Sequence, residues 1–241
     1  PSDPAEISAT LEQLSITPAF LSASVAVNAT LCTVIALAGA RLSRRRVVEC
    51  LRLGPTPSRG VITGAVSAVG FLSLSQALSS AQNLIAGDIA TSLSVIERAV
   101  VEASGTGFLL VLFATGLMAG AGEEIFFRGF MQTRLRRRWG AWPAILITSV
   151  AFGLLHFDWI HSPMAFCMGL FLGWITETTG SIRPAIAAHV VNNSTWVLTA
   201  GLWGGEASPW LEIGILASSC AGLMAAVVLL RGLFPAGPTG A

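Results

Sequence analysis

Long apolar runs separated by short polar segments dominate the chain from residue 18 to residue 230. Most of these runs approach the length of about 20 residues that a helix needs to cross a bilayer. Seven are predicted to be membrane-spanning helices: 18–40, 60–84, 105–130, 142–157, 163–178, 184–203 and 210–230. The pattern therefore predicts an all-α fold, a polytopic membrane helix bundle.

The chain outside these runs is short. Asp3, Pro4 and Glu6 have the residue types and spacing of a helix start, and the apolar residues that follow recur on one face. This pattern predicts a short amphipathic helix on the outer membrane surface, with a frayed terminus as the alternative. The predicted organisation has three parts: the amphipathic segment 1–17, a transmembrane domain at 18–231 and a disordered tail at 232–241.

Composition supports the membrane assignment. Hydrophobic residues make up 53% of the chain and charged residues only 11%, whereas a soluble domain carries about 25% charged residues. All 14 basic residues are arginines, which favours a bacterial source with a GC-rich genome. The four cysteines form no C-x-x-C motif and are expected to be small buried residues without a disulfide framework: Cys32, Cys50, Cys167 and Cys220.

The arginines order the runs relative to the membrane. Arg41, Arg44, Arg45, Arg46, Arg52 and Arg59 follow the first run, Arg134, Arg136, Arg137 and Arg138 the third, Arg183 the fifth and Arg231 the seventh. With seven spans, these four groups fall on one side, and only Arg98 lies on the other. The positive-inside rule then predicts an outer N-terminus and a cytoplasmic C-terminus, in a bacterial inner membrane.

Three charged residues interrupt the third run in the segment GEEIFFRGF. Ionisable side chains inside spans are rare and commonly mark a functional site. Glu124 and Arg128 are four residues apart on one helix face and are predicted to pair. Glu123 lies about 100° further round the helix and has no partner there, which makes it a candidate general base. The alternative is a buried structural ion-pair network.

Two later runs each carry a polar pair at helical spacing. Phe152 and His156 share a face of the fourth run, and His189 and Asn193 share a face of the sixth. Each pair alone is compatible with a core histidine or with ordinary interhelical hydrogen bonds. Together with Glu123, they could activate a water and stabilise an oxyanion, or they could hold a metal.

These patterns, in this order, resemble the three motifs of the CPBP intramembrane proteases. The motifs are E-E-x-x-x-R from Glu123, F-x-x-x-H ending at His156 and H-x-x-x-N from His189. The family includes the eukaryotic type II CaaX prenyl endopeptidase and many bacterial proteins, some associated with bacteriocin processing or immunity. The resemblance covers a motif core at about 105–203, and the flanking runs resemble the family only in being hydrophobic.

The resemblance implies an endopeptidase that hydrolyses a peptide bond of a membrane-associated protein or peptide. It implies that Glu123 polarises the attacking water with the help of His156. His189 and Asn193 would stabilise the oxyanion. The implied site thus has four catalytic and two supporting residues: Glu123, His156, His189 and Asn193, and Glu124 and Arg128.

Metal dependence and the class of function stay open at this point. No H-E-x-x-H segment is present, but Glu123, His156 and His189 could hold zinc with a fourth position open. A metal-free mechanism uses the same residues and is favoured, so no cofactor is expected. The expected partners are the substrate and the lipid bilayer, not nucleic acid. Two other functions remain: a non-proteolytic immunity or interaction protein, and a small proton-coupled transporter, which the lack of paired half-repeats disfavours.

The estimated depths of the motif residues disagree. At 1.5 Å per residue, Glu123 lies about 16 Å from the arginines that follow its run, whereas His156 lies about 21 Å from the start of its own run. His156 is thus expected nearer the outer side, and the two meet only if helices tilt or begin later. Asp158 and His161 are expected to be solvated residues of an outer loop.

Overall fold

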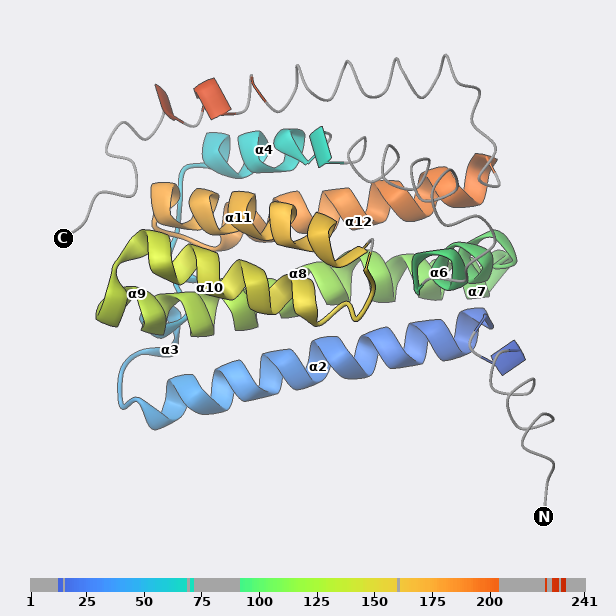
Figure 1. Cartoon of the computed structure of the whole chain (residues 1–241), viewed down its shortest axis with the longest axis horizontal. Coiled ribbons are helices and arrows are strands. Elements are labelled where there is room, and N and C mark those ends of the chain that lie inside the picture. The colour runs from blue at the N-terminus through green and yellow to red at the C-terminus, as the bar shows by residue number, and fades with distance from the viewer. Residues whose placement is uncertain are drawn as a thin grey trace.

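The computed structural model describes residues 13–14, 16–68, 70–71, 92–159, 161–203, 224, 227–229 and 231–232. In these residues the chain forms helices and no strand, which confirms the all-α class for this part of the protein (Figure 1). Four predicted features lie largely outside the described residues: the amphipathic segment 1–17, the runs 60–84 and 210–230, and the tail 232–241.

Two helices in the described part are long and apolar enough to cross a membrane. The first is α2 (Pro18–Leu42), which begins where the Thr17 side chain accepts a hydrogen bond from the Phe20 N–H. The second runs without a break over Gly105–Trp139. Both support a helical membrane protein. The total of seven spans stays a prediction, because two of the predicted runs are largely undescribed.

The helix Gly105–Trp139 is not a uniform α-helix. Its successive parts are α7 (Gly105–Val111), the π-helical η1 (Leu112–Ala119), α8 (Gly120–Glu124), the π-helical η2 (Ile125–Gln132) and α9 (Thr133–Trp139). π-Helical turns are rare and occur often at functional sites. Here they flank the two glutamates on α8. The helix continues beyond residue 130, the predicted end of this run, through the arginines that follow.

Five further helices and a single helical turn complete the described bundle: α3 (Val47–Cys50), α4 (Ser58–Ser67), α6 (Ser92–Val101), α10 (Ala141–Leu154), α11 (His161–Thr179) and α12 (Arg183–Trp203). The bounds of α2, α11 and α12 agree within two residues with the predicted runs. The fourth run differs, because α10 ends at Leu154 and His156 lies in the turn that follows.

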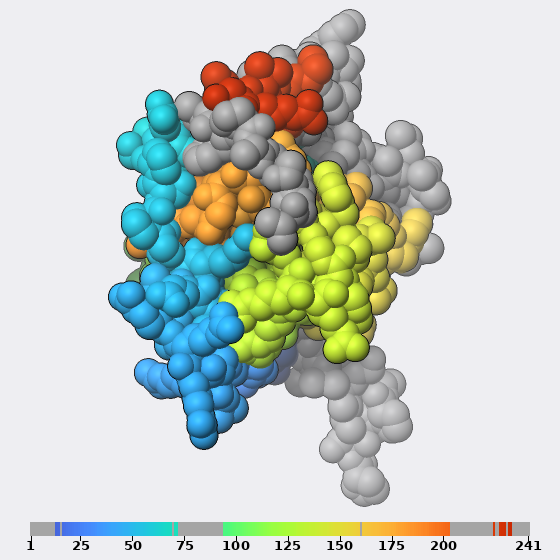
Figure 2. Space-filling view, turned by 90° about the vertical axis from the view of Figure 1, so that its left-hand side faces the viewer, coloured from blue at the N-terminus to red at the C-terminus, as the bar shows by residue number. Residues whose placement is uncertain are grey.

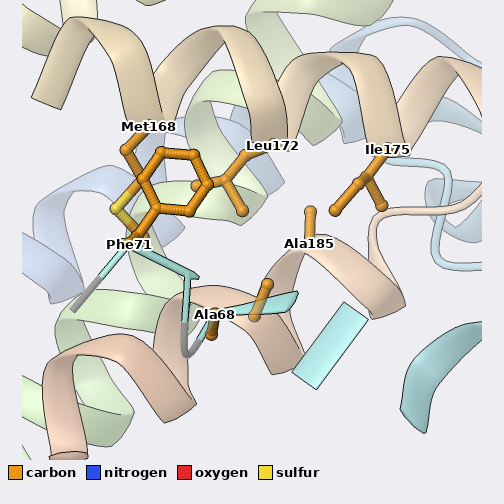
Figure 3. Packing of buried hydrophobic residues seen from close by; sticks show 7 residues of the cluster. Ala68, Phe71, Met168, Leu172, Ile175 and Ala185 are labelled. Carbon is orange, nitrogen blue, oxygen red and sulfur yellow. The ribbon is translucent and has the colours of Figure 1, made fainter. Parts of the chain in front are cut away.

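The central helix Gly105–Trp139 contacts helices on several sides. In Figure 1, α2 lies below it and α12 and α4 lie above it, while α10 and α11 pack against each other. One apolar cluster joins Ala68 and Phe71, which follow α4, to α11 and α12, and Figure 3 shows Phe71 against Met168 within it. The cysteine prediction holds for Cys32 and Cys50, which are buried, but Cys167 is exposed.

Two glycines allow the neighbours of α8 to approach its backbone closely. A Cβ atom on Gly120 would lie 2.9 Å from the backbone nitrogen of Val190 on α12. A Cβ atom on Gly122 would lie 2.6 Å from the backbone oxygen of Ala29 on α2. Backbone atoms cannot move aside as a flexible side chain can, so larger residues here would separate the helices. The glycines before Glu123 thus hold α8 between α2 and α12.

Replacing Gly122 by alanine is expected to lower the free energy of unfolding by about 1–3 kcal/mol, because the added methyl group overpacks the contact with α2. Gly54→Ala is the control, since nothing lies within 4 Å of a Cβ atom at that position. Reversible denaturation of the purified protein in detergent measures both. Equal stability of the two variants would contradict the close approach of α2 and α8.

The arginine-bearing segments meet at one end of the bundle. The carboxylate of Glu177, 1% exposed, accepts hydrogen bonds from Arg52 Nη1 at 2.6 Å and Gln132 Nε2 at 2.9 Å. Arg136 Nε lies 2.7 Å from its other oxygen. Figure 2 looks onto this end, where the chain after α2 (light blue) lies beside α9 (yellow-green). The orientation of this end relative to the cytoplasm stays a prediction.

Candidate active site

A buried ion pair forms the base of the site. The side chains of Glu124 and Arg128 are fully buried, and Arg128 Nη1 donates to Glu124 Oε1 at 2.7 Å. The pair is the one that the four-residue spacing predicts. The same carboxylate oxygen lies 2.9 Å from Nδ1 of His189 on α12. Because a carboxylate paired with arginine only accepts hydrogen bonds, Nδ1 carries the proton and donates it.

Glu123 faces away from this ion pair. One of its carboxylate oxygens accepts a long hydrogen bond of 3.4 Å from Asn28 Nδ2 on α2. The other oxygen lies 3.8 Å from His189 Nε2, which is too far for a hydrogen bond. His189 therefore lies between two carboxylates, bonded to Glu124 and close to Glu123. The partners of Glu123 come from distant helices, and its own helix supplies none, as predicted.

His156 bends back onto the end of α10. Its Nδ1 lies 2.9 Å from the carbonyl oxygen of Phe152. A carbonyl only accepts, so Nδ1 is the donor and Nε2 of the neutral ring is left as an acceptor. This hydrogen bond fixes the ring outside the regular helix.

The Phe152 ring packs against both histidines and against Arg128 of the buried ion pair. Its ring meets the rings of His156 and His189 edge to face, with centroids 5.1 and 5.7 Å apart. The guanidinium carbon of Arg128 lies 4.6 Å from the same centroid, within the range of a cation–π contact. One aromatic ring thus packs against residues of all three motifs and sets their relative positions.

Asn193 is held by the first π-helical segment. Its Nδ2 donates to the carbonyl oxygen of Thr115 at 3.1 Å, and its Oδ1 accepts from Asn192 Nδ2 at 3.1 Å. The contact with a carbonyl fixes which atom of the Asn193 amide is nitrogen. One N–H of Asn193 is left over after these contacts.

The four predicted catalytic residues line a single cavity of about 310 Å³. They are Glu123, His156, His189 and Asn193. The predicted difference in depth between Glu123 and His156 does not keep them apart, for two reasons. The arginines near Glu123 lie on the continuing helix and do not mark its end, and His156 folds back from the turn after α10. The remaining wall is largely apolar and includes Phe71, Ile96, Met164, Met168 and Trp196.

Two residues assigned to a solvated loop are placed differently. Asp158 is buried, and its Oδ1 accepts a 2.7 Å hydrogen bond from the backbone N–H of His161, which caps the start of α11. The side chain of His161 lines the cavity, with its ring centroid 4.3 Å from that of His156. The prediction of solvated loop residues is therefore wrong for both.

Sequence reasoning also missed Asn28. It lies on α2, lines the cavity and contacts Glu123. The available signal was an amide side chain in the middle of an otherwise apolar run. Polar residues at such positions face a partner or a cavity more often than lipid.

Glu123, His156 and His189, the donor set proposed for zinc, are not gathered around one point. Across the described residues, no group of three His, Cys, Asp or Glu side chains is placed to hold a metal ion. Nδ1 of His189 is taken by Glu124 and Nδ1 of His156 by a carbonyl, which leaves Nε2 as the one free nitrogen of each ring.

A carboxylate, two histidines and an amide thus meet around one cavity of an apolar helix bundle. Residues 105–195 match the family model described as type II CAAX prenyl endopeptidase Rce1-like. The match confirms the resemblance to the CPBP family, and the matched segment belongs to that family of membrane proteases. All six predicted site residues lie inside it. Comparisons with curated proteins and with solved structures found no match.

Proposed function

We propose that the chain is an intramembrane endopeptidase in which Glu123 activates a water to hydrolyse a peptide bond. The observation that carries the proposal is the position of His189. One of its nitrogens is fixed by the buried Glu124–Arg128 pair, and the other faces Glu123 at the cavity. A purely structural ion-pair network would have no need to present a second carboxylate to an open cavity.

The first step is the addition of water to the scissile carbonyl. Glu123 accepts one proton of the water, while the oxygen of the water forms a bond to the carbonyl carbon. His156 helps to bind the same water. Its Nδ1 is used by the backbone carbonyl of Phe152, so its Nε2 accepts the hydrogen bond from the water. Glu123 then returns the proton to the leaving amine as the C–N bond breaks. The products are a carboxylic acid and an amine, and Glu123 is restored.

The oxyanion is stabilised by His189 and Asn193. Nδ1 of His189 already donates to Glu124, so the donor to the oxyanion is a proton on Nε2, the nitrogen that faces Glu123 and the cavity. Asn193 adds its remaining N–H. Preorganised donors in a site with little water contribute a few kcal/mol each to transition-state stabilisation, on the order of 10²- to 10³-fold in rate.

The substrate proposed for this cavity is a membrane-associated protein or peptide. The apolar part of the wall suits a segment that approaches from the bilayer. The matched family model is named for CAAX prenyl substrates, so a prenylated C-terminal peptide is the first candidate to test. We place the protein in a bacterial inner membrane, with its N-terminus outside and its C-terminus in the cytoplasm.

The test compares protein termini in membranes that contain the wild-type protein or Glu123→Gln. Mass spectrometry of enriched termini should find a new terminus with the wild-type protein only. Arg98→Ala is the control, because Arg98 is exposed on α6 and away from the cavity, and it should produce the same termini as wild type. A fluorogenic peptide built around the cleavage site, called here the reporter peptide, then gives kcat and KM.

Identical termini in all three membranes would overturn the proposal. The two alternatives then differ in a second measurement. A proton-coupled transporter would move protons across liposomes in a manner that depends on Glu123. An immunity or interaction protein would keep its protective or binding effect in Glu123→Gln.

A further inference from the structure

The family match begins at residue 105, but the cavity has a wall on α2, well before it. Three α2 residues line this wall: Ser24, Val25 and Asn28. The carboxamide of Asn28 contacts the carboxylate that the proposed mechanism uses as its base. The matched segment therefore does not contain the whole environment of Glu123.

The sequence places Asn28 next to Glu123 through backbone packing. Ala29 on α2 is buried, and its carbonyl lies against Gly122, where a Cβ atom would come within 2.6 Å. Asn28 precedes Ala29 and Glu123 follows Gly122, so both lie next to this backbone contact. A glycine on one helix and an alanine on the other thus set the distance between the amide and the carboxylate.

We infer that Asn28 is a positioning residue for Glu123, supplied to the site by α2. The inference rests on the proposed function of Glu123 as the base. Asn28 Nδ2 donates to one oxygen of the carboxylate, so the other oxygen is left facing the cavity and His189. The contact restricts rotation of the Glu123 side chain and selects which oxygen receives the proton of the water.

A purely structural role for Asn28 makes a different prediction. An amide in the middle of an apolar span is unfavourable in lipid, so a leucine there should be tolerated or should stabilise the helix. If Asn28 served only the packing between helices, replacing it would alter the stability of the protein and leave the rate of the chemical step unchanged. The positioning role predicts the opposite pattern: an intact fold and a slower chemical step.

The experiment measures kcat and KM for the reporter peptide with Asn28→Leu, Asn28→Asp and Asn28→Gln. Asn28→Leu removes the donor and should lower kcat about 10-fold, with KM within about twofold of wild type. Asn28→Asp places a second acceptor beside the carboxylate and should lower kcat further. Asn28→Gln keeps the amide donor and should recover part of the lost rate.

Thr33→Val is the matched control on the same helix, because the Thr33 hydroxyl donates to the carbonyl of Ala29 within α2 and does not line the cavity. It should leave kcat unchanged. A kcat of Asn28→Leu within twofold of wild type, or an equal loss in Thr33→Val, would overturn the inference. Failure of the proposed function is recognised separately, since Glu123→Gln would then match the wild type.

Discussion

Replacing Glu123 by glutamine is expected to lower kcat for the reporter peptide by about 10²- to 10⁴-fold, the usual contribution of a general base. Glutamine has nearly the same shape but cannot accept the proton of the attacking water. KM should change little, since the carboxylate acts on the water and not on the bound peptide. The variant should keep the stability of the wild type, because Glu123 is not part of the buried ion pair.

Glu123→Asp sharpens this result. Aspartate keeps the acidic group but withdraws it by one methylene from the cavity and from His189. Its kcat should fall between those of the wild type and Glu123→Gln. Arg98→Ala should retain full activity. A wild-type kcat in Glu123→Gln would exclude Glu123 as the base and would leave the cavity without a proton acceptor on α8.

The helices were the more predictable part of the structure. Apolar runs locate α2, α11 and α12 to within two residues, because lipid-facing and core-facing residues alike must be apolar. The four-residue spacing also predicts the contact between Glu124 and Arg128, since both lie on one continuous helix. These features depend on sequence neighbours along a single helix.

The depth of each motif residue was less predictable. Straight α-helices that ended where charge begins would place Glu123 and His156 at different depths. Instead, two π-helical segments flank α8, and α9 carries arginines on a helix that continues to Trp139. His156 follows the end of α10 and turns back to the carbonyl of Phe152. Neither π-helical turns nor a histidine that folds back leaves a clear periodic signal.

Contacts between distant helices were the least predictable. The bond from His189 to Glu124 and the contact of Asn28 with Glu123 each join residues more than 60 positions apart. Both depend on which helices are neighbours, and apolar runs give no information on that. The glycines before Glu123 do carry such information, because they mark where other backbones come closest. Asp158 and His161 were misplaced for the same reason, since burial by another helix cannot be read from a short loop.

Replacing Arg128 by leucine is expected to lower the free energy of unfolding by about 3–5 kcal/mol, because it leaves the Glu124 carboxylate buried without its cation. Arg128 is fully buried, donates to Glu124 Oε1 at 2.7 Å and also donates to the carbonyl of Gly169 at 3.2 Å. Arg128→Lys should also be destabilising, since an ammonium does not reproduce the planar guanidinium fork. The exposed Arg137 on the same helix gives the control, and Arg137→Leu should change stability by less than about 0.5 kcal/mol.

The double variant Glu124→Leu with Arg128→Leu separates stability from function. Removing both charges leaves no unpaired ion, so the double variant should recover much of the stability that Arg128→Leu loses. It should remain inactive, because His189 then has no carboxylate to hold its Nδ1 and turn Nε2 toward Glu123. Denaturation in detergent measures the first effect and cleavage of the reporter peptide the second. A double variant that is stable and active would show that the ion pair has no part in orienting His189. A double variant as unstable as Arg128→Leu alone would show that the loss of stability comes from lost packing around Phe152 and not from the buried charge.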